Sequence, residues 1–177
     1  MDTFSGIPPA AFRFYAELAE NNTREWWLDH KDAYHAAVRV PMAGLLAALE
    51  AEFGPGRLFR PYRDVRFSQD KSPCKTAQGA FAARQEGVGY YLQVSADGLT
   101  LGGGYRTCAP AQLARYRSAV DTPGSGTALQ EIVDSIAAAG YSTAGDTLKS
   151  VPRGFDHDHP RAGLLRHKTL YVSADLG

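Results

Sequence analysis

The sequence has few cysteines, no long apolar run and no excess of one charge. Its two cysteines, Cys74 and Cys108, are 34 residues apart and fit no paired spacing for a metal ion. We therefore expect two reduced thiols without a disulfide or a bound metal. No stretch approaches the ~20 apolar residues that a membrane-spanning helix needs, and the N-terminus lacks the pattern of a signal peptide. These absences predict a cytoplasmic protein.

The net charge is zero, with 19 basic and 19 acidic residues. A dedicated binder of duplex DNA or of RNA usually carries a basic excess, so nucleic acid is not an expected partner. The three glycines at 102–104 lack the spacing of a dinucleotide fingerprint or a phosphate-binding loop, so we predict no cofactor. We interpret them as a place of close packing, with close approach of a ligand as the alternative.

The length of 177 residues, of which 44% are hydrophobic, suits one domain with a real core. Residues 1–54 are predicted to be helical. Proline at 8 and 9 suits a helix start, Asn22 is expected to cap a second helix, and Pro41 to begin a third that Gly54 ends. Residues 55–177 are predicted to mix strands and helices.

A β-hairpin is the clearest local prediction. Residues 90–96 are expected to return through an Asp97-Gly98 turn into residues 99–101, which places Ala96 opposite Leu99. Further along, helices are predicted at 110–120 and 127–138 with a loop at 123–126 between them, then a short helix and a closing strand at 169–172. The fold class is therefore α+β, an antiparallel sheet with a β-hairpin, flanked by about five helices.

The charge concentrates in one segment, the basic segment 57–75. It holds six basic residues against Asp64 and Asp70, a net of +4. Alternation predicts a strand over 62–67, followed by a loop with two lysines and hydroxyl groups. Arginine supplies paired hydrogen bonds and lysine a point charge, so the pattern is typical of a phosphate or carboxylate site. The candidate ligand-binding residues are Arg63, Asp64, Arg66, Ser68, Asp70, Lys71, Lys75 and Arg153.

We therefore predict that the protein binds a small anionic ligand that bears a phosphate or a carboxylate. Three alternatives stay open. Asp64 and Asp70 could pair with the cations as a purely structural network. They could instead act in a hydrolase-type enzyme beside those cations, or the basic face could meet a protein partner. No catalytic serine motif is present, and Cys74 has no sequence sign of an activating base.

A second polar segment lies at 152–160. Arg153 stands between proline and glycine, where a stiff turn can aim a guanidinium group at an anion. We expect it to converge with Arg66, Lys71 and Lys75. His157 and His159 could approach one metal ion, but no third ligand is evident, so no metal site is predicted.

Three motifs carry a resemblance to a known family. They are Asn21-Asn22-Thr23-Arg24-Glu25-Trp26-Trp27, then Arg63-Asp64-Val65-Arg66-Phe67-Ser68-Gln69-Asp70-Lys71-Ser72-Pro73, then Pro152-Arg153-Gly154-Phe155 with Asp158-His159-Pro160. In this order they resemble an uncharacterised bacterial and fungal family, domain of unknown function 2461, over nearly the whole chain. The sequence departs at Cys74, where an aromatic residue is expected, and at Gln69, where a lysine is expected. The resemblance implies no activity.

Overall fold

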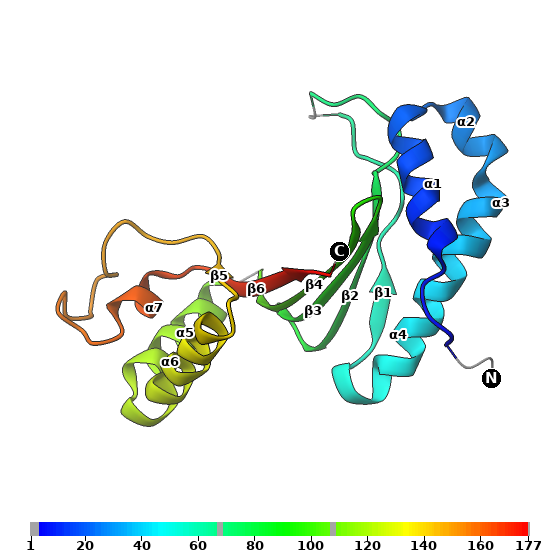
Figure 1. Ribbon diagram of the computed structural model, residues 1–177. Coiled ribbons are helices and arrows are strands. Elements are labelled where there is room, and N and C mark those ends of the chain that lie inside the picture. Colours follow the sequence, from blue (N-terminus) through cyan, green and yellow to red (C-terminus); the bar gives the residue numbers. More distant parts are fainter. Residues whose placement is uncertain (1–3, 67–68, 107–108, 177) are drawn as a thin grey trace. The chain divides into compact units, whose positions relative to one another are not determined.

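The computed structural model describes residues 4–66, 69–106 and 109–176 (Figure 1). The chain forms two compact units. Unit 1 comprises residues Met1–Leu101 and Asp175–Gly177, and unit 2 comprises Gly102–Ala174. None of the helices in the described ranges is long and apolar enough to cross a membrane. The prediction of a single domain over 1–177 stays a prediction.

The fold is α+β, as predicted, with six strands in the order β1-β2-β3-β4-β6-β5. β1 pairs with β2, β2 with β3 and β5 with β6, and each of these pairings is antiparallel. The strands are β1 (Gly56–Leu58), β2 (Ala77–Gln85), β3 (Val88–Ser95), β4 (Gly98–Tyr105), β5 (Thr143–Ala144) and β6 (Leu170–Asp175). The helices are α1 (Pro9–Glu20), α2 (Arg24–Asp29), α3 (Lys31–Tyr34), the π-helical η1 (His35–Arg39), α4 (Val40–Phe53), α5 (Pro110–Asp121), α6 (Pro123–Ala138) and α7 (Ala162–Arg166).

In unit 1 the helices cover one face of the sheet. Strand residues that alternate toward this face are buried against helical side chains, as an amphipathic sheet requires. Figure 1 shows α1 and α4 lying along strands β1–β3. The buried core consists of Ala11, Phe14, Tyr15, Leu18, Trp27, Tyr34, Val38, Met42, Leu46, Cys74, Ala80, Ala82, Leu92 and Val94.

Two sequence predictions in unit 1 need correction. Pro41 does not begin a separate helix, because the chain stays helical from Lys31 to Phe53 through the π-helical turn η1. A wider turn just before Pro41 suits a residue whose nitrogen cannot donate a hydrogen bond. The predicted strand 62–67 is also wrong. Tyr62 forms an isolated bridge with Cys74, and residues 63–66 belong to no strand.

The hairpin is confirmed, but its turn lies one residue earlier than predicted. β3 ends at Ser95, Ala96 and Asp97 form the turn, and β4 begins at Gly98. Ala96 is therefore in the turn and not opposite Leu99. Gly98 has a φ of 124°, a conformation that favours glycine.

Unit 2 has a core of its own. Val120, Leu164, Leu165 and Leu170 are buried, with aromatic and aliphatic side chains packed around them. The predicted loop 123–126 is the first turn of α6, because Pro123 fits the start of a helix. In the glycine run, Gly104 packs closely against a neighbouring strand. A side chain on Gly104 would overlap the carbonyl oxygen of Leu170 on β6.

Candidate functional site

Beyond β1 the basic segment forms a loop, and a short antiparallel ribbon of residues 61–63 and 73–75 lies at its base. Arg63 N donates to Pro73 O at 2.9 Å, and Lys75 N donates to Pro61 O at 2.8 Å. The bridge between Tyr62 and Cys74 lies between these two bonds. The base of the loop is therefore held by backbone hydrogen bonds, while the described residues of its tip, 64–66 and 69–72, are mostly exposed.

The first family motif fixes this ribbon in place. Asn22 Nδ2 donates to Cys74 O at 2.9 Å, and Cys74 N donates to Asn22 Oδ1 at 3.1 Å. Trp27 Nε1 donates to the Tyr62 hydroxyl at 3.3 Å, and the two rings meet edge to face. The predicted cap at Asn22 is wrong. The hydroxyl of Thr23 caps α2 by accepting from Trp26 N, which leaves the Asn22 amide for Cys74.

Replacing Asn22 by alanine is expected to lower the free energy of unfolding by about 2 kcal/mol, because it leaves a partly buried donor and acceptor of Cys74 without partners. Urea denaturation measures the change. Asn21→Ala is the matched control, since the Asn21 side chain makes one exposed bond to Glu17 O. Equal losses from the two variants would contradict a fixing role for Asn22.

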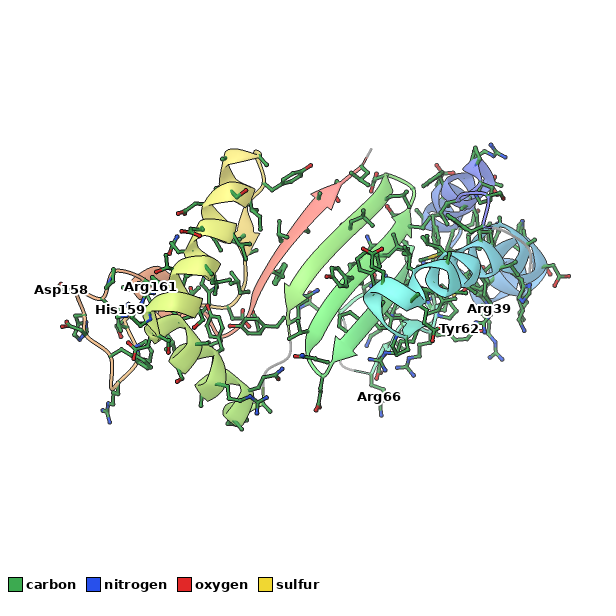
Figure 2. All side chains as sticks on the ribbon, turned by 90° about the horizontal axis from the view of Figure 1, so that it is seen from below. Arg39, Tyr62, Arg66, Asp158, His159 and Arg161 are labelled. Atoms are coloured by element: carbon green, nitrogen blue, oxygen red, sulfur yellow. The ribbon has the colours of Figure 1, made fainter. Side chains whose placement is uncertain are left out.

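Asp64 forms ion pairs with two neighbouring arginines. Its carboxylate accepts from Arg66 Nε at 3.0 Å and from Arg66 Nη2 at 2.7 Å, and Arg60 Nη2 lies 3.8 Å away. These hydrogen bonds from Arg66 hold the pKa of Asp64 below its usual range. The Arg66 side chain is 75% exposed, and Figure 2 shows it pointing away from the sheet. Such a pair at the surface contributes little to stability.

Asp70 is held in the same way at the other side of the tip. It accepts from Ser72 N at 2.9 Å and from the Ser72 hydroxyl at 2.7 Å, and Arg63 Nη1 lies 2.8 Å from its carboxylate. The bonds from Ser72, with Arg63 adding to them, lower the pKa of Asp70. Both carboxylates of the segment therefore stay ionised well below neutral pH.

The two lysines of the basic segment make different contacts. Lys71 Nζ donates to Val65 O at 2.9 Å. Lys75 Nζ lies 5.9 Å from the centre of the Phe59 ring. Ser68 lies outside the described residues, as do Phe67 and Cys108. Cys74 is a buried thiol, and burial raises its pKa to about 11, which suits a core residue better than a nucleophile.

Arg153 belongs to unit 2, so its convergence with the basic segment stays a prediction. Its turn matches the expectation of a tight bend, with Gly154 at a φ of 94° and Phe155 N donating to Pro152 O at 3.4 Å. The Arg153 side chain is exposed.

The third motif supplies a structural contact to α5. His159 Nδ1 accepts from Arg161 N at 3.0 Å, and Nε2 lies 3.3 Å from the Asp121 carboxylate. Arg161 Nε donates to Val120 O at 2.7 Å and Nη2 donates to Asp121 O at 3.0 Å. Figure 2 shows His159 and Arg161 close together. Both ring nitrogens of His159 are thus engaged by protein groups, and this arrangement caps the last carbonyls of α5.

Sequence reasoning missed two residues that belong beside Lys75. Arg57 lies on β1, and its Cζ lies 5.7 Å from the centre of the Phe59 ring. Phe59 is half-buried and its backbone N donates to Gly79 O. Arg57 could have been found from the charge of the basic segment, because it is one of the six basic residues counted there. Arg57 and Phe59 are two residues apart, but the approach of Lys75 to the same ring depends on how the loop folds back, which the sequence pattern did not supply.

A shallow groove of about 350 Å³ lies elsewhere in unit 1, between α4 and β1. Its walls are mostly small or aliphatic, with one cation and one carboxylate. The lining residues are Arg39, Ala43, Leu46, Ala47, Glu50, Gly56 and Leu58.

Comparison with known proteins gives one match. None of the curated proteins and none of the solved structures compared with the chain matches it. A family described as "Conserved hypothetical protein (DUF2461)" matches residues 10–177. This range includes all three motifs, so the chain belongs to the domain of unknown function 2461 family.

Proposed function

We propose that the protein binds a small phosphate- or carboxylate-bearing molecule in the cytoplasm through the cations of the basic segment. The excess of cations over carboxylates supports this proposal. Asp64 pairs with Arg66 and Asp70 pairs with Arg63, and Arg60 lies 3.8 Å from the Asp64 carboxylate. In the described part of the chain, no carboxylate oxygen lies within 4.0 Å of Arg57 or Lys75.

Two like charges near one ring oppose each other unless an anion neutralises them. At ~4 Å and an effective dielectric constant near 20, a pair of charges interacts by roughly 4 kcal/mol, and less at larger separations. An anion bound between Arg57 and Lys75 turns this repulsion into two attractions. The ribbon at the base of the segment carries Lys75, so the cation is presented by backbone that is already ordered.

The hydrolase alternative draws less support from the geometry. A general acid needs a pKa near the working pH, and a carboxylate with a low pKa is also a weak base. Hydrogen bonds from Arg66 and Ser72 lower the pKa of Asp64 and of Asp70. The interaction module stays a second candidate, because Arg60 and Arg66 are 68% and 75% exposed.

Thermal unfolding with and without millimolar phosphate or citrate, at constant ionic strength, tests the proposal. A free ligand concentration of about a hundred times Kd stabilises the folded state by about 2.7 kcal/mol. For a chain of this length, each kcal/mol of stabilisation raises Tm by about 2–4 °C. We expect Lys75→Gln to remove most of this rise. Arg66→Ala should reduce the rise in Tm less, because the Arg66 guanidinium is already paired with the Asp64 carboxylate.

Lys149→Gln is the matched control, since Lys149 is an exposed lysine in a loop of unit 2. It should keep the full rise in Tm. If no anion raises Tm in the wild type, or if Lys149→Gln removes the effect as fully as Lys75→Gln does, the proposal is wrong.

A further inference from the structure

The sheet of unit 1 carries aromatic side chains on the face opposite the helices. Ala80, Ala82 and Leu92 alternate into the core, so Phe81 and Tyr91 between them point to the other face. Phe81 pairs with Tyr91 across β2 and β3, and with Arg57 across β1 and β2. A cation and two aromatic rings therefore stand in one row across three strands.

Phe59 extends this aromatic surface, and two cations lie near its ring. Its ring centre is 6.3 Å from that of Tyr91, with 32° between the ring planes. Arg57 Cζ lies 5.7 Å and Lys75 Nζ lies 5.9 Å from the Phe59 ring centre. Phe59, Phe81 and Tyr91 all keep part of their surface exposed. We call Arg57, Phe59, Lys75, Phe81 and Tyr91 the aromatic-cation surface.

Glycines beneath the rings allow them to lie close to the strands. A Cβ atom on Gly79 would stand 2.9 Å from Phe59 Cδ2 and 2.9 Å from the Tyr91 hydroxyl. One on Gly89 would stand 2.7 Å from Phe81 Cζ. The Tyr91 hydroxyl is further fixed by donating to Gln93 Oε1 at 2.7 Å. Rings held in this way form a rigid apolar platform, which loses little entropy when a flat ligand binds.

We propose that the anionic ligand of this protein is a free nucleotide, whose base stacks on the aromatic-cation surface and whose phosphate contacts Arg57 and Lys75. The inference rests on the proposed anion-binding function and names its ligand class. A ligand with an aromatic ring and a phosphate matches both halves of the surface, since base–aromatic stacking and phosphate–cation contact are the two interactions that nucleotides offer.

Charge favours a free nucleotide over a strand of nucleic acid. A strand binder tracks many phosphates with a basic groove. This chain has zero net charge, and among its described residues Arg57 and Lys75 lie beside one ring with no carboxylate oxygen within 4.0 Å. A simple anion such as phosphate would use the cations but leave the rings without a role. The base is therefore expected to add at least about tenfold to the affinity.

Isothermal titration calorimetry compares AMP, ribose 5-phosphate, adenosine and an eight-residue thymidine oligonucleotide with the wild-type chain. We expect AMP to bind at least about tenfold more tightly than ribose 5-phosphate. Phe59→Leu should bring the affinity for AMP close to the affinity for ribose 5-phosphate. Lys75→Gln should weaken both ligands. Tyr141→Leu, which removes a 47% exposed tyrosine of unit 2, is the matched control and should change neither affinity.

The outcomes separate this inference from the proposed function. Equal affinities for AMP and ribose 5-phosphate would overturn the nucleotide assignment and leave anion binding intact. Absence of binding by every phosphate compound would overturn both. An oligonucleotide that binds more tightly than AMP at matched ionic strength would replace the free nucleotide by a strand. If Phe59→Leu does not fold, the adenine H2 and H8 proton shifts of AMP on wild-type protein decide. Stacking moves them upfield, and unchanged shifts contradict it.

Discussion

Replacing Gly126 by alanine is expected to lower the free energy of unfolding by about 3 kcal/mol. In an open helical position the same change usually stabilises by up to about 1 kcal/mol, because alanine has the higher helix propensity. Gly126 lies in the first turns of α6 and is buried. A Cβ atom there would overlap the carbonyl oxygen of Val120 and Nε of Arg161, and would stand 2.9 Å from the Val120 carbonyl carbon.

The overlap is costly because neither neighbour can yield freely. Val120 O is backbone at the end of α5, and it already accepts the hydrogen bond from Arg161 Nε at 2.7 Å. Moving Arg161 breaks the contact that caps α5, and moving Val120 shifts a residue of the unit 2 core. Overpacking and loss of a charged hydrogen bond therefore act in the same direction.

Gly124→Ala is the control, since it lies two residues earlier in α6 and a Cβ atom there meets nothing within 4 Å. We expect it to leave stability unchanged or raise it slightly. Urea denaturation of both variants measures the difference. A stabilising effect of Gly126→Ala, similar to that of Gly124→Ala, would show that the chain does not pack against this glycine as described.

Short sequence motifs predicted the presence of a secondary-structure element better than the residues at which it ends. Glycine beside aspartate marked the hairpin, but the turn is at Ala96-Asp97. The position of a turn also depends on which strand residues face the core, and here Val94 pairs with Gln78 on β2. That pairing involves residues far apart in the sequence. A dipeptide preference alone therefore located the hairpin but not its register.

Side-chain bonds to nearby backbone explain why the described residues 62–66 of the predicted strand 62–67 form no strand. The Asp64 carboxylate accepts from Arg66 N as well as from the Arg66 side chain. Asp70 accepts from Ser72 N in the same way. Such bonds give the backbone a turn-like alternative to a strand ladder. The alternation of polar residues favoured a strand, but these local bonds hold the backbone in turns instead.

The sequence predicted only the charged part of the candidate site. The charge count identified the basic segment, and Lys75 belongs to the site that we propose. Arg57, Phe59 and Tyr91 could not be joined to it from the sequence, because their proximity follows from the pairing of three strands and the return of the loop. The apolar half of the surface is therefore visible only once the register is known.

A change of Gln78 to glutamate is expected to lower the free energy of unfolding by about 4 kcal/mol at neutral pH. Gln78 is 1% exposed and fully bonded. Its Oε1 accepts from the Tyr34 hydroxyl at 2.6 Å, and its Nε2 donates to Phe59 O and Gly79 O, each at 2.8 Å. A carboxylate keeps the first bond but places an acceptor against two carbonyl oxygens.

Burial and the facing carbonyls raise the pKa of the introduced carboxyl above its unfolded value of about 4.3. The sign of the pH dependence follows. Below the unfolded pKa the group is protonated in both states and the charge penalty is absent. As the pH rises the unfolded state releases the proton first, so the penalty grows by about 1.4 kcal/mol per pH unit until the folded group also ionises. Denaturation at pH 5 and at pH 7.5 should therefore show a larger loss at the higher pH.

Gln85→Glu is the matched control on the same strand, because Gln85 is exposed at the end of β2. Its effect should stay within about 0.5 kcal/mol at both pH values. Tyr34→Phe removes the hydroxyl that donates to Gln78 Oε1 and also bonds the Arg39 side chain. This change should cost about 1 kcal/mol without the same pH dependence. Two outcomes would contradict the described hydrogen bonds of Gln78 to Tyr34, Phe59 and Gly79. One is an equal loss of stability in Gln78→Glu and Gln85→Glu. The other is a loss at Gln78 that does not grow with pH.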